Sequence, residues 1–520
     1  MPVLARCGEA PQSETVERGV SMAGPERSYD TVVVGAGNAA LCAALAAREQ
    51  GASVLVLEAA PQHARGGNSY FTGGLMRFPF RGMDDIRAVI PDLSEAEANA
   101  VELDPYTEDQ FYEDVARLGE YRADPELLAC LVSNAFPTMC WLQEKGVRFT
   151  LATGRQAFRV GDRFRFYGNL VVEAVGGGPG LIEALFRAAE RDGAEVWYEA
   201  RALRLLTDDG RRVRGVLVQR EGSYLEVRAR SVVLACGGFE ANPEMRARYL
   251  GPNWDLAKVR GTAFNQGDGI RMALEIGAQP FGHWSGCHAV AWDANAPPYG
   301  DRKVGDLFQK HSYPLGIVVN RLGQRFLDEG ADFRNYTYAR YGAEILKQPG
   351  QIAFQIFDAK VTHLLRDEYR IPQVTKATAD TLEELAERLG IDREGFLRTV
   401  REFNAAVQDG TFNPAVKDGK GTRGITPPKS NWALPIDTPP FVGYAVTCGI
   451  TFTYGGLRIN TQGQVLDVYD RPLPGLYAAG ELVGGLFYHN YPGGSGLMAG
   501  SVFGRIAGRG AGQYAVATRS

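Results

Sequence analysis

The sequence predicts an α/β protein in which a Rossmann-like nucleotide-binding domain is interrupted by an inserted α+β capping domain. Residues 29–58 have the pattern of a strand, a glycine-rich turn, a helix and a second strand, and glycine-rich segments return near the C-terminus. Between them the sequence is rich in aromatic residues, Pro and His. We therefore expect the nucleotide-binding domain at 29–283 and 453–515, the capping domain at 284–452, and a flexible N-terminal extension at 1–28.

The first βαβ unit carries a dinucleotide-binding fingerprint. Gly35, Gly37 and Ala40 fill the G-x-G-x-x-G/A pattern after the apolar run Thr31–Val34. Gly35 permits the tight turn, Gly37 lets backbone N–H groups approach a pyrophosphate, and Ala40 keeps the helix close to the strand. Glu58 ends the second strand about 20 residues later, where a carboxylate binds a ribose hydroxyl. The unit predicts a bound dinucleotide.

The other elements are predicted from hydrophobic period and from helix start and stop signals. Thr381 and Glu384 form a capping box for a helix that ends at Gly390, and Asp392 caps a second helix. In chain order we expect helices at 108–119, 124–146 and 179–193, a hairpin at 213–219 and 224–227, a strand at 231–235, a helix at 268–277, the helical pair at 381–407, strands at 453–460 and 475–479, and a helix from 495 to about 510.

Further glycine-rich segments are suited to a flat ring system. RGGNS at 65–69 and TGG at 72–74 follow the acidic residue, and glycines at this density let the backbone lie against a flat ring. Near the C-terminus a strand ends in Gly480-Glu481, and a glycine loop leads into a helix that begins at Ser495. The positive end of that helix would stabilise negative charge on a reduced flavin.

Composition narrows the class of protein. The net charge of −5 offers no basic footprint for nucleic acid, and no apolar stretch reaches the roughly 18 residues of a transmembrane helix. The seven cysteines contain no C-x-x-C pair, which argues against metal sites and a disulfide framework. Residues 1–28 lack the apolar core of a secretory signal. We expect a cytoplasmic protein without a bound metal.

The chain resembles the flavoprotein subunits of the fumarate reductase and succinate dehydrogenase superfamily. The matching segments are VVVGAGNAALCAALAA, GGNSYFTGG, SVVLACGGFEAN, GDGIRMALEIGA and GLYAAGELVGG, in this order from residue 29 to about 510. The resemblance implies FAD as cofactor. A covalent flavin would need a histidine where this chain has Gly67, so we expect non-covalent FAD.

Motifs and resemblance together predict a set of FAD-binding residues. The predicted residues are Gly35, Gly37, Asn38, Ala39, Ala40, Glu58, Ala59, Gly66, Gly67, Asn68, Ser69, Thr72, Gly73, Gly74, Ala235, Gly237, Gly238, Asn265, Asp268, Gly480, Glu481, Ser495, Gly496 and Leu497.

Within the superfamily, RGTAFNQG, DEGADFRNYTYARYG, WALPIDTPPF and GITFTYGGL are similar to the tricarballylate dehydrogenase group. Fumarate-reducing relatives hold their dicarboxylate with two histidines and an arginine, and a second arginine transfers the proton. His288 matches the first histidine, and Arg334 matches the proton-transfer arginine with a one-residue gap. Phe452 replaces the second histidine, and Tyr491 replaces the carboxylate-binding arginine. A plain fumarate or succinate site is therefore not expected.

Other departures add candidates. The Glu and Arg of the usual proton relay fall near Gln309 and Ser312. The HNYPGGSG segment around Tyr491 is also similar to 3-ketosteroid Δ1-dehydrogenases, whose catalytic tyrosine falls near Tyr444. A phenol polarises a carbonyl or takes a proton if its pKa is lowered. The predicted catalytic residues are Arg334, Tyr444, Tyr491 and His288.

Each candidate also has a structural interpretation. Arg334 has acidic neighbours such as Asp332 and would then be a surface ion-pair partner. Because a guanidinium normally stays protonated, Arg334 would otherwise bind a carboxylate in bidentate fashion. Arg260 either reaches a substrate carboxylate or pairs with Asp268. His311 would be a hydrogen-bonded structural residue, and the tyrosines would pack as amphipathic filler.

The predicted reaction is dehydrogenation of a C–C bond next to a carboxylate or carbonyl. The first hypothesis is a tricarballylate-type polycarboxylate dehydrogenase that forms an aconitate. Alternatives are a 3-ketosteroid Δ1-dehydrogenase-like ketone desaturase, a fumarate reductase-like enoate reductase, and a flavin-binding protein without turnover. No second dinucleotide fingerprint is present, and residues 176–179 lack a preceding strand pattern. Electrons are therefore expected to pass to a separate acceptor: a partner protein, a quinone or oxygen.

Overall fold

The computed structural model describes residues 27–519. Strand β1 (Arg27–Val34) begins inside the predicted N-terminal extension, so Arg27 and Ser28 belong to a sheet. The rest of that predicted extension, residues 1–26, lies outside the described residues. Within the described range, no helix is both long and apolar enough to cross a membrane.

Strand β12 (Ser223–Leu234) is the centre of the larger sheet. It pairs in parallel with β1 on one side, while its end pairs in parallel with β20 (Pro472–Ala478) on the other. Its first half pairs antiparallel with β11 (Val213–Arg220), and β2 (Val54–Leu57) extends the parallel part beyond β1. The predicted Rossmann-like α/β fold is confirmed. The sheet is completed by β9 (Glu195–Trp197) beside β2, β10 (Ala200–Thr207) beside β11, and β19 (Gln464–Leu466) beside β20.

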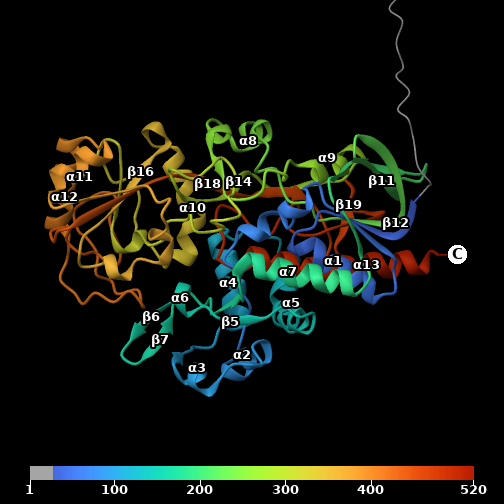
Figure 1. Cartoon of the computed structure of the whole chain (residues 1–520), viewed down its shortest axis with the longest axis horizontal. Helices are drawn as coiled ribbons and strands as arrows, with labels where there is room; N and C mark the ends of the chain where they lie inside the picture. Colours follow the sequence, from blue (N-terminus) through green and yellow to red (C-terminus); the bar gives the residue numbers. More distant parts are fainter. Residues whose placement is uncertain (1–26, 520) are drawn as a thin grey trace, which may run out of the picture.

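Two helices from opposite ends of the chain lie side by side on this sheet. Helix α1 (Asn38–Glu49) of the fingerprint packs against α13 (Ser495–Ala517), the C-terminal helix. Helix α7 (Gly177–Arg191) also packs against α1, and α5 (Pro125–Glu144) against α13. Figure 1 shows α7, α1 and α13 running together along one side of the molecule.

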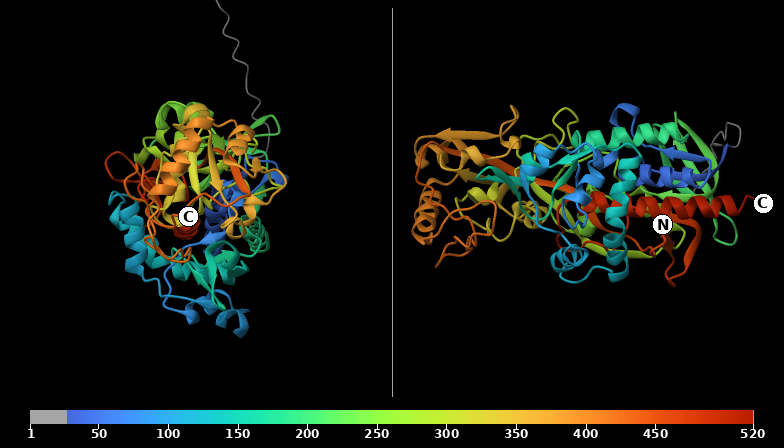
Figure 2. Two further views of the ribbon diagram at one scale, coloured as in Figure 1. Left: turned by 90° about the vertical axis from the view of Figure 1, so that its left-hand side faces the viewer. Right: turned by 90° about the horizontal axis from the view of Figure 1, so that it is seen from below.

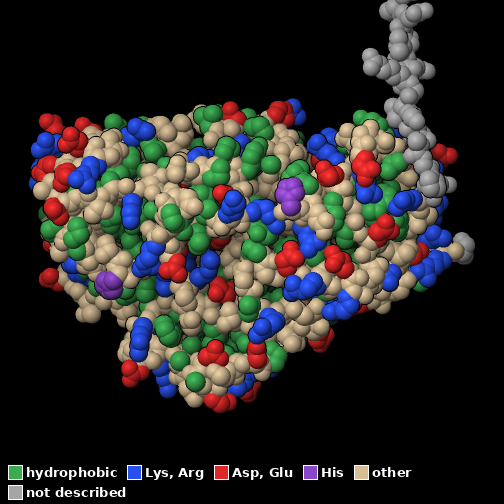
Figure 3. All heavy atoms as spheres, in the orientation of Figure 1, with side chains coloured by type: hydrophobic (Ala, Val, Ile, Leu, Met, Phe, Trp, Pro, Cys, Tyr) green, Lys and Arg blue, Asp and Glu red, His purple; other side chains and the backbone are tan. Residues whose placement is uncertain are grey.

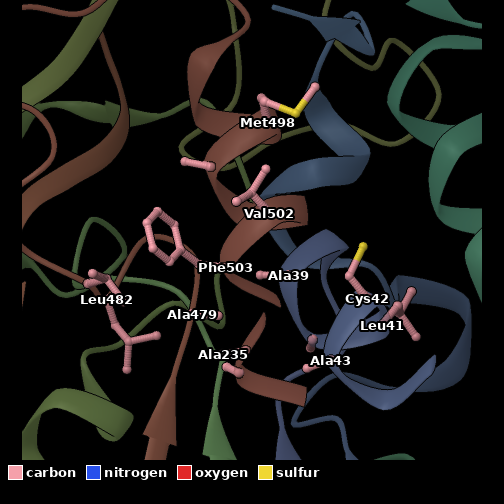
Figure 4. Packing of buried hydrophobic residues seen from close by; sticks show 14 of the residues in the cluster. Ala39, Leu41, Cys42, Ala43, Ala235, Ala479, Leu482, Met498, Val502 and Phe503 are labelled. Carbon is pink, nitrogen blue, oxygen red and sulfur yellow. The ribbon is translucent and has the colours of Figure 1, made fainter. Parts of the chain in front are cut away.

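Small residues allow α1 and α13 to approach closely. A Cβ added at Gly504 would lie 2.4 Å from the carbonyl oxygen of Ala39, and one added at Gly508 would lie 2.1 Å from that of Ala43. Figure 4 shows Ala39 and Ala43 facing α13, with Phe503 on the far side of that helix. The stripe of small residues on the two helices therefore sets their separation.

The inserted segment has its own sheet, built around β18 (Phe441–Leu457). This strand pairs antiparallel with β14 (Pro280–Asp293), β16 (Ala353–Phe357) and β17 (Lys376–Ala379). The predicted domain boundaries fall inside β14 and β18, which are single strands shared by both parts of the molecule. The sheet also contains β13 (Lys258–Val259), beside β18, and β15 (Ile317–Asn320), beside β16.

The helical pair of the insertion covers this sheet. Leu385 of α11 (Leu382–Leu389) and Phe396 of α12 (Arg393–Ala406) are buried in one apolar cluster with Ile356. The right-hand view of Figure 2 shows an elongated molecule, with the orange segment that contains α11 and α12 at the end away from the C-terminus of α13. On the face drawn in Figure 3, basic and acidic side chains are interspersed rather than gathered by sign.

Helix α11 departs from the predicted capping box in one respect. The Thr381 hydroxyl accepts the N–H of Glu384 at 3.2 Å, and Asp392 accepts that of Gly395 at 2.7 Å, so both predicted N-caps are present. The Glu384 carboxylate, however, accepts a hydrogen bond from Arg388 one turn later. A charged partner on the same helix face replaces the second half of the box.

Three predicted elements differ from the structure. The strands predicted at 224–227 and 231–235 form one strand, β12. Its two halves pair with different neighbouring strands, but no turn separates them. Helix α13 continues past residue 510 to Ala517, since small residues keep it against α1. A strand, β8 (Val172–Ala174), does precede the glycines at 176–178. It pairs antiparallel with β3 (Leu75–Met76) and β5 (Phe149–Leu151), outside the parallel sheet.

The close helix contact predicts the effect of one added methyl group. Gly508→Ala would place a Cβ against the Ala43 carbonyl, so we expect the free energy of unfolding to fall by about 1–3 kcal/mol, the usual cost of overpacking. Gly154→Ala is the matched control, because an added Cβ there meets no atom within 4 Å. Urea unfolding of both variants tests this. Equal stability of Gly508→Ala and wild type would show that the two helices can separate freely.

Candidate active site

A large cavity lies at the carboxyl ends of the parallel strands, where the two sheets meet. Gly35 after β1, Glu58 after β2, Gly237 after β12 and Gly480 after β20 line one half of it. The other half is lined by residues of the insertion, including His288 of β14. Ligands of open α/β sheets bind outside the carboxyl ends of the strands, so this position is the one expected of a dinucleotide.

Gly35 and Gly37 of the fingerprint are glycines for different reasons. Gly35 has φ +102°, and an added Cβ would lie 2.4 Å from the Ala235 carbonyl oxygen, so the protein itself requires glycine there. At Gly37 (φ −81°) an added Cβ would come no closer than 3.6 Å, to the Ser69 hydroxyl. Nothing in the fold demands glycine at Gly37, which is the N-cap of α1 and lines the cavity. The open space at a helix N-terminus fits a pyrophosphate.

Most residues predicted to bind FAD line this cavity, and five do not. Ala40 is fully buried within α1, Gly66 and Gly74 (φ +105° and +70°) form turns against neighbouring backbone and side chains, Gly238 lies behind Glu481, and Ser495 is fully buried at the start of α13. The structure places the following predicted residues in the lining: Gly35, Gly37, Asn38, Ala39, Glu58, Ala59, Gly67, Asn68, Ser69, Thr72, Gly73, Ala235, Gly237, Asn265, Asp268, Gly480, Glu481, Gly496 and Leu497.

Glu58 is held in place by backbone. Its Oε1 accepts the N–H of Ala60 at 2.9 Å, and the residue is buried at the end of β2. Burial raises the pKa of its carboxyl group. A carboxyl at this position can accept a hydrogen bond from a ribose hydroxyl.

A second buried carboxyl group, Glu240, was not predicted to belong to the site. Its Oε1 accepts from Asn68 at 2.6 Å and from Asn265 at 2.5 Å, and it lies beside Glu481. Burial, and for Glu481 the neighbouring Glu240 charge, raise the pKa of both carboxyl groups. Asn68 also donates to the Thr451 carbonyl at 2.6 Å. This network ties the glycine-rich loop to β18 of the insertion.

Aromatic rings surround His288 in the other half of the cavity. His288 is 1% exposed, and its ring centroid lies 4.8 Å from Tyr491, 4.9 Å from Tyr338 and 5.2 Å from Phe452. Neither ring nitrogen has a hydrogen-bond partner among the described residues. Burial and the charge of Arg260 hold the pKa of His288 well below its ordinary value, so the ring is neutral. Three residues predicted from the resemblance, His288, Phe452 and Tyr491, are thus brought together.

Tyr338 was missed by the sequence analysis, although it lies one helical turn after Arg334. Both residues belong to α10 (Arg334–Leu346), and residues four apart share a helix face. The Tyr338 hydroxyl lies 2.6 Å from that of Tyr491. Burial raises the pKa of both phenols, that of Tyr338 well above its ordinary value. Both are therefore neutral hydrogen-bonding groups.

Arg334 lies on the wall of the cavity with its guanidinium group fixed by neutral partners. Nε donates to the Tyr167 hydroxyl at 2.8 Å, and Nη2 donates to the Arg155 carbonyl at 2.6 Å. Nη1 lies 3.4 Å from Nδ1 of His311. Among the described residues, no carboxylate oxygen lies within salt-bridge distance of this guanidinium. Burial lowers its pKa, but Tyr167 and the charge of Glu368 outweigh that effect, so the pKa is above its ordinary value.

The surface ion-pair interpretation of Arg334 is wrong. Its neighbour Asp332 pairs instead with Arg117 at 3.5 Å and with Lys417 at 3.4 Å. These partners lie on other segments and draw the Asp332 carboxylate away from the cavity. The Arg334 charge is left facing the cavity.

The predicted pairing of Arg260 with Asp268 is also wrong. Asp268 binds Arg201 through two hydrogen bonds of 2.8 and 2.9 Å. Arg260 instead directs Nε and Nη2 at Oδ1 of Asp306, at 2.8 and 2.7 Å. Arg155 reaches the other Asp306 oxygen at 3.7 Å. Asp306 comes from a loop and Arg155 from the short helix α6 (Thr153–Gln156), and no local sequence pattern predicts that they converge.

Tyr444 is the predicted catalytic residue that the structure does not bring to the cavity. Its ring packs edge-on against Tyr369, with centroids 4.9 Å apart, and against Phe357. Position 444 lies on β18 several residues before Phe452, within the sheet of the insertion. Its geometry is that of an apolar packing residue.

We expect Gly37→Ala to fold normally and to lose FAD. The protein leaves room for the new Cβ, whereas a bound pyrophosphate at the helix N-terminus does not. Thermal unfolding of the FAD-free protein should match wild type, and the flavin content after purification should fall to a small fraction. Gly154→Ala serves as control for both measurements. Normal flavin content in Gly37→Ala would place the pyrophosphate elsewhere.

The carboxyl pair predicts a pH-dependent stability. Because burial raises the pKa of Glu240 in the folded state, the folded protein retains the Glu240 proton to a higher pH than the unfolded chain does. Stability is therefore full below the ordinary glutamate pKa of 4.5 and declines as the pH rises through the raised value. Glu240→Gln, which imitates the protonated form, should flatten this decline in melting temperature. Glu387→Gln, on the exposed side of α11, should leave it unchanged; equal slopes in both variants would contradict the prediction.

Comparisons with known proteins support the interpretation of this cavity as an FAD-binding site. Residues 30–497 match the family described as FAD binding domain. A probable fumarate reductase of Shewanella frigidimarina (strain NCIMB 400) is 31% identical over 500 residues, which cover 95% of this chain and 76% of that protein. The open conformation of a flavocytochrome c3 fumarate reductase is 29% identical, with a TM-score of 0.70 over 95% of this chain and 79% of that chain.

A second solved structure shares the fold. The 3-ketosteroid Δ1-dehydrogenase of Sterolibacterium denitrificans superposes with a TM-score of 0.71 at 23% identity, over 95% of this chain and 100% of that chain. The family match covers the strands, glycine turns and helix N-termini that form the cavity. The chain belongs to the FAD-binding flavoprotein family that includes the fumarate reductases, and it is an FAD-dependent oxidoreductase.

Proposed function

We propose that the protein dehydrogenates the bond between two saturated carbons of a polycarboxylate, converting a tricarballylate-type substrate to an aconitate-type product. The observation that carries the proposal is Arg334, a guanidinium on the cavity wall that forms no ion pair within 4.0 Å among residues 27–519. Two of its nitrogens are already fixed by Tyr167 and by the Arg155 carbonyl. A fixed planar fork is suited to binding a carboxylate through two parallel hydrogen bonds.

Two further arginines favour an anionic substrate over an apolar one. Arg155 and Arg260 line the same half of the cavity as Arg334. Asp306 neutralises part of their charge, since both bind its carboxylate. The Arg334 charge is then the principal one left for the substrate, and Arg155 and Arg260 provide positive surroundings for further carboxylates.

FAD, when bound, accepts the hydride that leaves the substrate's β-carbon. The residues present fit it: glycine backbone at Gly35 and Gly37, the Glu58 carboxyl, and the N-termini of α1 and α13. We further propose that FAD is held without a covalent bond, because the position expected for an attached histidine is Gly67. Flavin that dissociates on acid denaturation would agree with this.

The substrate half of the cavity orients the reacting carbons and excludes water. His288, Phe452 and Tyr491 form an aromatic wall, and His311 adds a neutral ring whose centroid lies 4.9 Å from Tyr338. Arg334 serves as the carboxylate-binding residue in this proposal, because its raised pKa keeps it protonated. A carboxylate held there withdraws electron density from the adjacent carbon and makes its proton more acidic.

A ketone desaturase is the second candidate, favoured by the phenol pair. The hydroxyls of Tyr338 and Tyr491 lie 2.6 Å apart, so one donates to the other, and the remaining O–H is free to polarise a carbonyl oxygen. Phe452, in place of the histidine of fumarate-reducing relatives, also suits a less polar substrate. An enoate reductase would use the same groups in the reverse direction. In the cytoplasm, a dehydrogenase would pass its electrons to a separate partner protein, a quinone or oxygen, whereas a reductase would receive them from a partner protein or a reduced quinone.

Anaerobic reduction of the flavin tests the function. Tricarballylate should bleach the visible absorbance of the oxidised protein, whereas androst-4-ene-type ketones and succinate should bleach it far more slowly. Bleaching by the ketone alone would establish the second candidate. Reoxidation of the reduced protein by fumarate, without bleaching by any saturated acid, would establish the reductase.

We expect Arg334→Lys to keep the charge and lose the planar fork. Each charge-assisted hydrogen bond contributes about 1.5–3 kcal/mol, so kcat/KM for the acid should fall by about 10²-fold. Flavin content should not change. Arg340→Lys, at an exposed position of the same helix, is the matched control and should behave as wild type. A kcat/KM within a few-fold of wild type in Arg334→Lys would remove Arg334 from the substrate site.

A further inference from the structure

Dehydrogenation of a C–C bond requires a group that accepts the proton of the α-carbon, and none of the four residues predicted from sequence is suited to it. We infer that Glu368 is this proton acceptor. Glu368 lies in the short turn η7 (Asp367–Tyr369) of the insertion and lines the cavity together with His311 and Arg334. The inference rests on the proposed CH–CH chemistry but not on the identity of the acid.

Arginine and tyrosine residues of the cavity hold their protons. The pKa of Arg334 is above its ordinary value because of Tyr167 and Glu368, which outweigh the effect of burial. The phenols of Tyr338 and Tyr491 have raised pKa values because both are buried. A group that is already protonated and resists ionisation cannot take up the substrate proton.

The two histidines are also poor acceptors. Nδ1 of His311 faces Nη1 of Arg334, which can only donate, so Nδ1 is the acceptor in that contact. The remaining nitrogen, Nε2, then carries the hydrogen and has no partner among residues 27–519. Burial and Arg334 hold the pKa of His311 well below its ordinary value. His288 is likewise neutral, enclosed by rings and next to the Arg260 charge.

Among the carboxyl groups lining the substrate half, Asp306 is already engaged. Its two oxygens bind Arg260 and Arg155, so accepting a proton would break those ion pairs. The other three carboxyl groups lie in the cofactor half of the cavity: Glu58 follows β2, Asp268 follows the Gly267 turn, and Glu481 follows β20. Glu368 remains.

The surroundings of Glu368 fit a carboxylate base. Its side chain is buried, the residue being 5% exposed, and its Oε1 has no hydrogen-bond partner in the described part of the chain. Its charge raises the pKa of Arg334 and opposes the lowering of the Lys310 pKa by burial, so both cations lie close enough to feel it. Oε1 itself is enclosed by protein, so the rest of the carboxyl group, which lines the cavity, would make the contact with a bound substrate.

The turn that carries Glu368 is anchored on both sides. The Tyr369 hydroxyl accepts the N–H of Ser312 at 2.8 Å and donates to Gln355 at 2.5 Å. Arg366 donates its backbone N–H to the Ser312 hydroxyl at 3.3 Å. These bonds fix the backbone of Glu368 relative to His311, the residue before Ser312. A base held in this way keeps its position during turnover.

The Cα–H bond breaks, and the proton moves to the Glu368 carboxylate, which becomes a carboxylic acid. The electron pair of that bond forms the C=C bond as the hydride leaves the neighbouring carbon with its two electrons, which FAD accepts as the oxidant. Glu368 then returns its proton to solvent. In the reductive direction the protonated Glu368 supplies the same proton to carbon.

Glu368→Gln tests the assignment, because it keeps the size of the side chain and removes the proton acceptor. With the substrate that reduces the wild-type flavin fastest, kcat should fall by roughly 10²–10⁴-fold. Flavin content should match wild type, and calorimetry should show aconitate bound as tightly or more tightly, since one negative charge is gone. Asp367→Asn is the matched control: its neighbouring side chain is 92% exposed, and kcat should not change.

The outcomes separate this inference from the proposed function. The proposed substrate is wrong if tricarballylate fails to bleach the wild-type flavin while a ketone bleaches it, or while an enoate reoxidises the reduced protein. In either case Glu368→Gln is measured with the active compound. A kcat within a few-fold of wild type in that variant overturns the inference. Loss of flavin and aconitate binding in both Glu368→Gln and Glu368→Asp overturns it too, by showing a structural role. Retained binding with partial activity in Glu368→Asp supports it.

Discussion

The site depends on the close contact between α1 and α13, helices from opposite ends of the described chain. Glycines at Gly504 and Gly508 bring the two backbones together, and Asn38 joins their starts by donating to the Leu497 carbonyl at 2.9 Å and accepting from Ser501 at 3.1 Å. Both helices therefore begin at the same cavity. Two positive helix ends in one place suit a cofactor that carries a pyrophosphate and gains negative charge on reduction.

The long strands β14 and β18 connect the nucleotide-binding part of the protein to the insertion. They pair with each other from the nucleotide-binding sheet outward, and His288 and Phe452 are direct partners in that pairing. The substrate half of the cavity is consequently joined to the cofactor half by strand pairing, which is interrupted by irregularities after His283 and after His288. Asn68 adds a side-chain link to Thr451 at the same point. Rotation of the insertion as a rigid body would have to bend these strands.

The sequence was sufficient for features that depend on local pattern. The fingerprint, the helix caps at Thr381 and Asp392, and the convergence of His288, Phe452 and Tyr491 all follow from residue order or from the resemblance. Asp306, Arg155 and Glu368 could not be predicted, because they reach the cavity from a loop, the short helix α6 and the turn η7, whose approach depends on tertiary packing. Tyr338 could have been found, since it lies four residues after Arg334 on a predicted catalytic segment. Tyr444 is the opposite case: its position resembles a catalytic motif, but in the folded protein its ring packs within the sheet of the insertion and does not reach the cavity.

The charges of the cavity give a physical reason for placing the base beside the cofactor. Separating charge in a poorly solvated cavity is expensive. A flavin that accepts a hydride gains one negative charge, and Glu368 loses one when it takes the proton. The net charge of the cavity would then be the same before and after the reaction, and the positive end of α13, which lines the cavity, would favour the added negative charge. In the proposed function, Asp306 holds Arg260 and Arg155 throughout, and Arg334 retains the substrate carboxylate. The chemistry moves charge within the cavity and changes none at its surface.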